Sequence, residues 1–434
     1  MALDAAGISH SGLRRTRFSR RRVLVSGAAA TVTLMGSARA SAGERVVVGV
    51  MGLQRGASLA ETFAATPGVV VKYLCDVDAA RREKAAARLE KVGVQADLTG
   101  DYRRMLDDRE VDAFVCAAPN HWHATATIQA CQAGKHVYVE KPCSQTPQEG
   151  VWMNAAAEKH GRIVQVGTQR RSSPPVRDAI ERIQNGMIGD VFAARSWYHN
   201  KRRSIGRGTV ADPPASLDYD SWQGPVPRTP YRTNLIPYNW HWFWDYGNGE
   251  LGNNGVHGID LCAWGLGVEL PRRVTSTGGR YWFDDDQQTP DTQTVSLDFE
   301  GREIVWTGLS CNGHGSGFVT FYGNGGTLEI DADGGYRVFD QADALVAERP
   351  GTAGRGQEEH VANFVDAIRA DSVASLAAGI GVGHRSALLC HLGNIAQRVG
   401  RSLICDPATG AVIDDTAAME FWSRDYEPGW EPAV

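Results

Sequence analysis

Between residues 44 and 168, apolar strand-like runs alternate with helix-like runs, and this alternation constrains the fold more than any other feature of the chain. The strand-like runs are apolar on both faces: ERVVVGVMG, VVVKYLCDVD, VDAFVCAAP, HVYVEKP and RIVQVGTQ. Between them, AARREKAAARLEKVG is rich in helix formers, and HATATIQACQAGK ends at a glycine and a lysine. Such alternation predicts a parallel sheet covered on both sides, which is a doubly wound α/β domain.

The pattern changes beyond Gly167. Segments such as DVFAARSWYH and TQTVSLDFEGREIVWTGLS alternate apolar and polar residues, and Phe299–Arg302 is a hairpin-turn candidate. We therefore predict a second, α+β domain over residues 169–434 with a mainly antiparallel sheet. Two helices are expected there, EEHVANFVDAIRA and HRSALLCHLGNIAQRVG, the second ending at Gly400. A chain of 434 residues is also longer than one core usually holds.

Residues 1–43 have the features of an export leader. Arg20–Arg22 precede an apolar run from Val23 to Met35, and Ala38–Ala40 matches an A-x-A cleavage site. Ser19–Leu24 resembles a twin-arginine signal, so we expect export to the periplasm or another extracytoplasmic space. A disordered basic tail is the alternative. No apolar run reaches about eighteen residues, so no stable membrane span is predicted.

The charge and the cysteines limit the classes of partner. The formal net charge is −5, and the leader carries seven arginines and one aspartate before residue 41, so its removal leaves −11. This acidity argues against nucleic-acid binding, which needs a basic surface. The eight cysteines form no C-x-x-C pair. We expect small buried hydrophobes, with neither a zinc motif nor essential disulfides.

The first strand leads into a glycine-rich turn typical of dinucleotide binding. VVVGVMGLQRGASLAETF leaves a strand and enters a helix, whose N-terminus can hold a pyrophosphate. The fingerprint is imperfect, because Gln54 and Ala57 stand where the second and third glycines would follow Gly52. Asp76 ends the second strand and can accept a hydrogen bond from a ribose hydroxyl. Since Val77 offers nothing to a 2′-phosphate, NAD is favoured and NADP stays open.

The next strand ends in AAPNHWHA. Asn120 can cap the following helix, and His121 and His123 fall in its first turn, where the helix dipole lowers the pKa of an imidazole. An H-x-H pair alone does not define a metal site, and we predict none.

The strand HVYVEKP ends at the same edge of the predicted sheet. Lys141 can hydrogen-bond a substrate hydroxyl there and stabilise a developing alkoxide, with Glu140 orienting it. A surface ion pair is the alternative, but adjacent residues of a strand point to opposite faces and pair poorly. The predicted cofactor contacts are Gly52, Leu53, Gln54, Arg55, Gly56, Asp76, Pro119, Asn120, His123, Glu140 and Lys141.

Several of these segments resemble one family. APNHWH, GKHVYVEKP, VGTQRR and GNGELGNNGVHGIDL resemble the glucose–fructose oxidoreductase, inositol dehydrogenase and MocA family, and the resemblance covers essentially all of the chain after the leader. It implies an N-terminal Rossmann domain over residues 44–168, a C-terminal open-faced sheet, and an NAD(P) site between them. It also implies sugars, inositols or their derivatives as substrates, and homodimers or homotetramers.

Carried over by position, the resemblance implies Lys141 as the substrate-contacting lysine and His257 as the acid/base, and these two are the predicted catalytic pair. Many members carry an aspartate where Asn253 stands, and an amide cannot relay a proton as a carboxylate does. The aromatic run YNWHWFWDY can pack against a sugar ring or build a core, and both readings stay open. The predicted substrate contacts are Glu140, Gln169, Arg170, Asn253, Asp260 and Trp244.

These observations favour an exported NAD(P)-dependent oxidoreductase that acts on a hydroxyl of a sugar, glycoside or cyclitol and holds its cofactor tightly. One alternative is a redox-neutral glycosidase, lyase or epimerase on the same fold. Another is a non-catalytic sugar or nucleotide sensor.

Overall fold

The computed structural model describes residues 45–434, so the predicted leader lies outside the described residues. Six parallel strands form the first sheet: β1 (Val46–Met51), β2 (Val69–Cys75), β3 (Asp97–Thr99), β4 (Ala113–Cys116), β5 (His136–Val139) and β6 (Val164–Val166). Their order is β3-β2-β1-β4-β5-β6, which is the order of a doubly wound dinucleotide-binding sheet. The predicted parallel sheet is confirmed. Its carboxyl edge at β1 and β4, where the strand order reverses direction, is where such sheets bind ligands.

Helices on both faces bury this sheet, and local sequence sets where they begin. They are α1 (Gly56–Ala65), α2 (Ala79–Glu90), α3 (Arg103–Asp107), α4 (Asn120–Gln132) and α5 (Pro147–Lys159). The Asp78 side chain accepts from the Ala80 N–H and caps α2, and Thr146 and Glu149 form a capping box at α5. β1, β4 and the end of β5 are buried, as the doubly apolar runs predicted.

The second sheet is mainly antiparallel, as predicted. Its strands are β7 (Val191–His199), β8 (Arg273–Gly279), β9 (Thr292–Phe299), β10 (Arg302–Leu309), β11 (Val319–Gly323), β12 (Gly326–Ile330), β13 (Tyr336–Asp340), β14 (Leu345–Arg349) and β15 (Leu403–Ile404). They run in the order β14-β13-β12-β11-β7-β10-β9-β8-β15, with β7 and β10 parallel. The predicted hairpin joins β9 to β10, and Gly301 in its turn has a φ of 74°.

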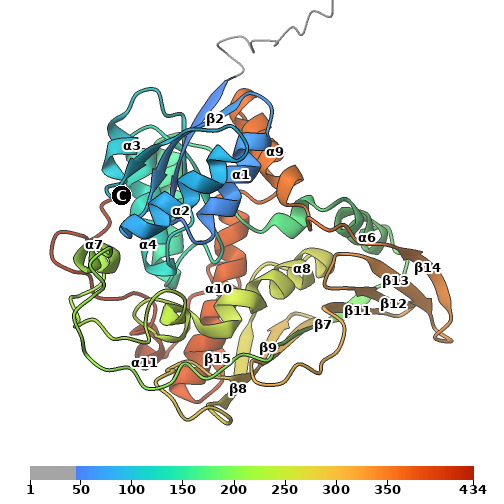
Figure 1. Ribbon diagram of the computed structural model, residues 1–434. Helices are drawn as coiled ribbons and strands as arrows, with labels where there is room; N and C mark the ends of the chain where they lie inside the picture. The colour runs from blue at the N-terminus through green and yellow to red at the C-terminus, as the bar shows by residue number, and fades with distance from the viewer. Residues whose placement is uncertain (1–44) are drawn as a thin grey trace, which may run out of the picture. The chain divides into compact units, whose positions relative to one another are not determined.

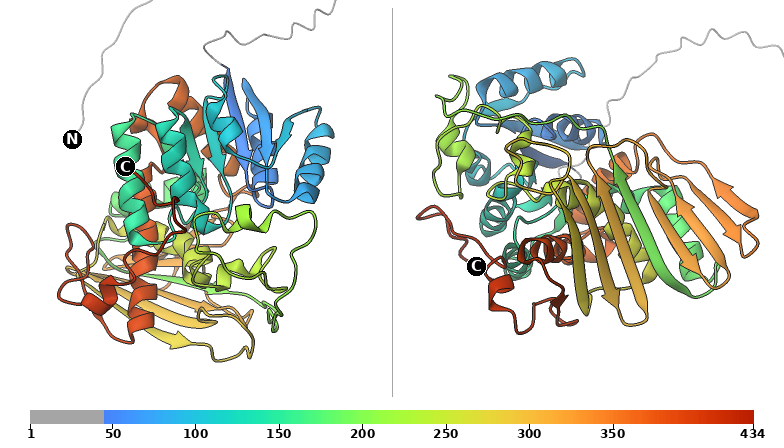
Figure 2. Two further views of the ribbon diagram at one scale, coloured as in Figure 1. Left: turned by 90° about the vertical axis from the view of Figure 1, so that its left-hand side faces the viewer. Right: turned by 90° about the horizontal axis from the view of Figure 1, so that it is seen from below.

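The remaining helices link the two sheets. They are η1 (Gln169–Ser172), α6 (Pro174–Gln184), α7 (Tyr219–Gln223), η2 (Asn239–Trp242), η3 (Leu251–Gly255), α8 (Val256–Leu266), α9 (Gln357–Arg369), η4 (Val373–Ser375), α10 (Ile380–Val399) and α11 (Thr416–Met419). One face of the second sheet packs against α6, α8 and α10 around the buried Trp306, whereas no helix of residues 45–434 covers its other face (Figure 2). Gly400 ends α10 in the left-handed region, as predicted.

The chain returns to the first domain after completing most of the second sheet. α9 lies beside α1 (Figure 1), and its Phe364 is fully buried against Phe63 and Tyr138, with ring centroids 6.3 and 5.9 Å apart. The C-terminal half therefore contributes to the core of the first domain, which a boundary at residue 168 did not anticipate.

Two findings concern cysteines and membrane contact. All eight cysteines are free, and all but Cys311 are buried, so the prediction of small buried hydrophobes is confirmed for seven of them.

Within residues 45–434, no helix combines the length and apolarity needed to cross a bilayer.

If α9 is part of the first core, Phe364→Ala should destabilise the protein by about 3–5 kcal/mol, the usual cost of removing a buried phenylalanine. Urea unfolding followed by circular dichroism measures the change. Phe192→Ala is the matched control, because Phe192 is 54% exposed on β7 and should change stability by less than about 0.5 kcal/mol. Equal losses in the two variants would contradict the assignment of α9.

Candidate functional site

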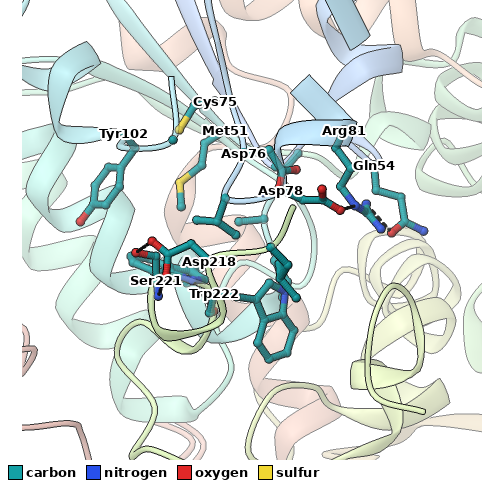
Figure 3. A pocket seen from close by; sticks show the side chains of 18 of the residues that line it. Met51, Gln54, Cys75, Asp76, Asp78, Arg81, Tyr102, Asp218, Ser221 and Trp222 are labelled. Carbon is teal, nitrogen blue, oxygen red and sulfur yellow. Dashed lines mark hydrogen bonds and ion pairs between the residues drawn. The ribbon is translucent and has the colours of Figure 1, made fainter. Parts of the chain in front are cut away.

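A cavity of about 1050 Å³ runs along the carboxyl edge of the first sheet. Residues after β1, β2, β4 and β5 form one side, and residues of the second half close the other. Figure 3 shows Asp76, Asp78 and Arg81 across this cavity from Asp218 and Trp222. The predicted cofactor contacts that line it are Gly52, Gln54, Arg55, Asp76, Pro119, His123, Glu140 and Lys141.

Gly52 fits a loop that must pass close to the neighbouring strand end. Its φ is +86°, and a Cβ there would lie 2.4 Å from the Ala118 nitrogen and 2.5 Å from the Ala117 carbonyl carbon. No L side chain is compatible with that approach. The chain thereby keeps open the space that a dinucleotide needs, although the second and third glycines of the fingerprint are missing.

Asp76 fits the ribose end of the same ligand. Its Oδ2 accepts from the Leu53 N–H at 2.7 Å and its Oδ1 from the Asp78 N–H at 3.0 Å, so the carboxylate is fixed at the cavity wall. Burial raises the pKa of Asp76, while these two hydrogen bonds act to lower it. The loop and this carboxylate together fit an NAD, with the pyrophosphate near Gly52 and a ribose at Asp76.

Three predicted cofactor contacts do not line the cavity. Leu53 is 4% exposed and packs in the core of the first domain, and Gly56 begins α1 behind the loop. Asn120 does not cap α4, because Pro119 holds the cap position and the Asn120 amide donates to Asn248 Oδ1 at 3.0 Å. In these cases backbone register and packing, which the motif does not encode, decide whether the residue faces the cavity.

His121 and His123 both contact backbone carbonyl oxygens. His123 Nδ1 lies 2.6 Å from the Pro142 carbonyl oxygen and Nε2 lies 2.8 Å from that of Ala118. Burial is the main cause that lowers the pKa of both imidazoles, and the predicted helix-dipole effect is not needed to explain it. Among residues 45–434, no group of three or more His, Cys, Asp or Glu side chains could hold a metal ion.

Glu140 is paired with the glycine-rich loop instead of with its neighbour. Arg55 Nε donates to Glu140 Oε1 at 2.8 Å, and Arg55 also bonds Gln357 at the start of α9. Glu140 Oε2 accepts from the Lys141 backbone N–H at 3.2 Å, so it fixes the main chain and does not touch the Lys141 ammonium. Burial alone raises the pKa of Glu140, but the charges of Arg55 and Lys141 outweigh it and hold the pKa below its usual value.

Lys141 points across the cavity to the second half of the chain. Its Nζ donates to the Asn253 carbonyl oxygen at 2.8 Å and lies 3.3 Å from Asn253 Oδ1. Burial lowers the pKa of Lys141, and the nearby charge of Glu140 only partly offsets that effect. An amine of this kind can donate to an oxygen in the cavity and can also release its proton.

His257 is affected by the charge of Lys141 more than by any other charge, and its catalytic pairing with Lys141 stays a prediction. It lines a second cavity of about 410 Å³ together with Gln169 and Arg170. Asn253 lies within the π-helical turn η3, and His257 is the second residue of α8, which begins directly after that turn. Burial lowers the pKa of His257 well below its usual value, with the charge of Lys141 the next cause, and its Nδ1 is buried without a partner.

Two predicted substrate contacts lie elsewhere. Asp260 is 1% exposed, and both its carboxylate oxygens accept from Arg171 Nε, at 3.0 and 2.9 Å, so it is a structural ion pair. Trp244 lines a third cavity, of about 300 Å³, and packs against Arg398. The aromatic run was expected to place Trp244 at the substrate site. Instead, Trp240, which lies in the short helix η2, lines the large cavity.

Sequence reasoning missed Tyr238 and His241, which line the large cavity with Lys141 and Asn253. Asn253 Nδ2 lies 3.3 Å from Tyr238 Oη, and His241 Nδ1 lies 2.6 Å from the Tyr238 carbonyl oxygen. A connected polar group therefore runs from Lys141 through Asn253 to Tyr238 and His241. The only signal for this group in the sequence is the histidine inside YNWHWFWDY.

A long connection, residues 211–246, covers the outer side of the large cavity, and we call it the strap. The Ala79 N–H donates to the Ser216 carbonyl at 2.8 Å, and the Asp218 N–H donates to the Val77 carbonyl at 3.1 Å. The Trp222 carbonyl oxygen lies 2.9 and 3.0 Å from ring nitrogens of His121 and Trp122. The strap has its own apolar cluster: Leu217, Tyr219, Trp222, Val226, Tyr231, Leu235, Trp240, Phe243 and Tyr246.

Because burial lowers the pKa of Lys141, a larger fraction of its amine is neutral than in a free lysine, by about tenfold for each unit of lowering. Brief reductive methylation near neutral pH of protein freed of bound nucleotide, mapped by mass spectrometry, should label Lys141 before the exposed Lys201, and added NAD⁺ should slow it. Burial also lowers the pKa of Lys135, but its Nζ donates to two backbone carbonyls away from the cavity, so NAD⁺ should not protect it. Equal labelling of Lys141 and Lys201, or no effect of NAD⁺, would refute the placement.

Two family models match the chain. Residues 44–168 match an oxidoreductase family, NAD-binding Rossmann fold, and residues 183–310 match an oxidoreductase family, C-terminal alpha/beta domain. The first match covers the six-stranded sheet and the glycine-rich loop. The second begins in α6 and ends after β10.

Characterised relatives include sugar and cyclitol enzymes. The chain is 28% identical over 210 residues to levoglucosan dehydrogenase of Pseudarthrobacter phenanthrenivorans, covering 46% of this chain and 47% of the relative. It is 31% identical over 156 residues to inositol 2-dehydrogenase of Salmonella typhimurium, covering 36% and 45%. It is 31% identical over 170 residues to a glycosyl hydrolase family 109 protein of Saccharopolyspora erythraea, covering 37% of each. Each match spans less than half the length of the relative.

Solved structures share the whole fold. Levoglucosan dehydrogenase in complex with NADH and levoglucosan superimposes with a TM-score of 0.65 at 20% identity, covering 83% of this chain and 99% of that one. An oxidoreductase domain protein from Kribbella flavida gives a TM-score of 0.66 at 20% identity with the same coverage. With its NAD-binding Rossmann domain and open second sheet, the chain belongs to the glucose–fructose oxidoreductase, inositol dehydrogenase and MocA family of oxidoreductases.

Proposed function

We propose that the protein is an NAD-dependent oxidoreductase that acts on a carbinol of a sugar, glycoside or cyclitol. The observation that carries the proposal is the large cavity. Gly52 and Asp76 at one part of its wall suit a dinucleotide, and the half-buried amine of Lys141 lines the same cavity. Levoglucosan and inositol are named for relatives of this chain, which supports a polyhydroxylated ring as the substrate.

NAD⁺, when bound, supplies the hydride acceptor for such a reaction. The residues of this chain must then bind the hydroxyl group, hold it and move its proton. Lys141 donates a hydrogen bond at the cavity, and the same contact stabilises the negative charge that develops on an alkoxide oxygen. The ion pair between Arg55 and Glu140 fixes the turn that carries Lys141. Trp240 supplies an aromatic face that suits the apolar face of a sugar ring.

Lys141→Met should lower kcat/KM by about 10²–10³-fold, because it removes a hydrogen bond to the developing charge while keeping the volume of the side chain. The wild-type protein is first incubated with NAD⁺ and a panel of sugars, cyclitols, anhydrosugars and glycosides, and products are read by mass spectrometry. A loss of two hydrogens reports oxidation, whereas loss of an aglycone reports cleavage. Binding without any mass change across the panel would favour a sensor and sink the enzymatic proposal.

Lys201→Met is the matched control, since Lys201 is exposed and lies outside the cavity. It should leave kcat/KM unchanged within about twofold. In Lys141→Met, the affinity for NAD⁺ should stay within about threefold of wild type, because Gly52 and Asp76 are untouched. A collapse of NAD⁺ affinity in Lys141→Met alone would mean that the lysine serves the cofactor more than the substrate.

We further propose that the protein is exported with its cofactor already bound and does not exchange it. Support comes from the twin-arginine-like segment at Ser19–Leu24 and from the strap, which is fastened to the first domain at Val77–Ala79 and again at Trp222. An extracytoplasmic space offers no substantial pool of soluble NAD(H), so a trapped cofactor must be restored within each cycle. Either a second substrate is reduced, or a single substrate is oxidised, altered and reduced again.

The redox-neutral route has one specific observation in its favour besides the strap: the match to a glycosyl hydrolase family 109 protein. A carbonyl formed transiently on a ring acidifies the neighbouring C–H bond, which permits elimination of a glycosidic oxygen or epimerisation. The same panel separates this route from net oxidation, because it gives cleavage or an isomer without accumulated NADH.

Purified protein should release stoichiometric nicotinamide nucleotide when it is denatured, and Trp222→Ala should speed cofactor dissociation by about tenfold, because it removes a ring that anchors the strap over the cavity. Loss of bound nucleotide during dialysis against nucleotide pyrophosphatase measures the rate. Trp282→Ala is the control, since Trp282 is 71% exposed and lies outside the strap. Absence of nucleotide in fresh protein, with weak affinity for added NAD⁺, would refute the retained cofactor.

A further inference from the structure

The fit of the dinucleotide identifies one end of the large cavity as the adenosine end. With the pyrophosphate near Gly52 and the adenosine ribose at Asp76, the adenine belongs beyond Asp76, on the side away from Lys141. The end of β3 lies next to this point, because the Asp76 N–H donates to the Thr99 carbonyl oxygen at 3.2 Å. Thr99 and Tyr102, just before α3, both line the cavity there.

Aromatic rings from three parts of the chain form a wall at this end. The ring centroids of Tyr102 and Trp122 lie 5.4 Å apart at an interplanar angle of 75°. Trp430 packs against Trp122 in turn, with centroids 5.2 Å apart at 89°. All three rings line the cavity, and Trp430 is only partly buried although it packs on the core of the first domain. An aromatic ring that is partly free at a nucleotide cavity suits the π-face of a purine base.

This third ring belongs to residues 424–434, which we call the tail, and the tail is bonded to the first domain at two places. Arg424 Nε donates to Glu149 Oε1 in α5 at 2.8 Å. The Glu149 side chain is fully buried, so solvent screens this ion pair little. Gln132, the last residue of α4, donates to the Ala433 carbonyl oxygen at 2.7 Å, and the tail therefore runs beside α4 (Figure 1).

The tail is also bonded to the strap. The Glu427 N–H donates to the Pro225 carbonyl oxygen at 3.0 Å, and Glu427 Oε2 accepts from the Arg228 N–H at 3.1 Å. The Trp430 N–H donates to the Glu427 carbonyl oxygen at 3.0 Å, so the residue that bonds the strap also positions the ring. The strap can move away from the adenosine end only if the tail loses its bonds to the strap or its bonds to the first domain.

We propose that the tail holds the strap closed over the adenosine half of bound NAD, and that Trp430 forms part of the adenine subsite. The inference rests on the proposed function and names the segment that retains the cofactor. The tail lies outside both regions that the family models match, residues 44–168 and 183–310, so those matches give it no role. A tail that only covered the apolar surface of α4 would affect stability and leave nucleotide binding unchanged.

The first test measures binding by calorimetry to the full chain, freed of nucleotide by prolonged incubation with nucleotide pyrophosphatase. ADP-ribose is the probe that carries the adenosine half without the nicotinamide. Trp430→Ala should weaken the binding of ADP-ribose and of NAD⁺ equally, by about tenfold, the usual effect of removing a ring beside a base. Trp430→Phe keeps a ring and should stay within about threefold of wild type. Val434→Ala is the matched control in the tail, since Val434 is 40% exposed, and should change neither affinity.

The second test measures the closure of the strap by hydrogen exchange and mass spectrometry. Glu427→Ala removes the acceptor of the Arg228 N–H, so strap peptides that contain the Asp218 N–H should exchange about fivefold faster, and NAD⁺ should dissociate faster by a similar factor. Peptides of β9 in the second sheet should exchange as in wild type, which shows that the variant is folded.

Three results would overturn the inference and leave the proposed function standing. They are unchanged strap exchange in Glu427→Ala, unchanged affinities in Trp430→Ala, and a loss in Trp430→Ala for NAD⁺ but not for ADP-ribose. Failure of the wild type to bind either nucleotide would remove the proposed function as well.

Discussion

The site depends on the ion pair between Arg55 and Glu140. This pair joins the glycine-rich loop after β1 to the turn after β5, and the bond from Arg55 to Gln357 extends it to α9. Glu140 is 5% exposed, so its charge has to be compensated within the protein. Because Arg55 does so, Glu140 can bind the Lys141 backbone N–H, and the Lys141 side chain is left free to reach Asn253.

Three remote parts of the chain meet at this pair, which explains why the second half returns to the first sheet. α9 buries Phe364 beside Phe63 and places Gln357 next to Arg55. The strap closes the opposite side of the cavity through backbone hydrogen bonds at Val77 and Ala79. A dinucleotide site on an open sheet edge normally faces solvent on one side. Here residues of the strap line that side of the cavity, among them Leu217, Trp222 and Tyr238.

Local features of the site could be predicted from sequence, whereas contacts set by remote segments could not. Strand and turn chemistry predict the buried strands and the positions of Gly52 and Asp76 at the cavity. The position of Lys141 at the cavity is predicted by its place at a strand end. The π-helical turn η3, which carries Asn253 directly before α8, has no recognised signal in the sequence. Trp240 and His241, and not Trp244, line the large cavity because of the position of the short helix η2 within the strap.

Asn253 connects the fold to the kind of chemistry the site can support. A carboxylate at this position would lie within reach of the Lys141 ammonium and would raise the lysine pKa, because opposite charges favour ionisation. The amide bonds the ammonium without a compensating charge, and Glu140 is already paired with Arg55, so burial prevails and the lysine pKa stays low. A lysine whose pKa is lowered in this way can release a proton and take it up again at the cavity. Proton release accompanies oxidation of a carbinol, and proton uptake accompanies the reverse reduction.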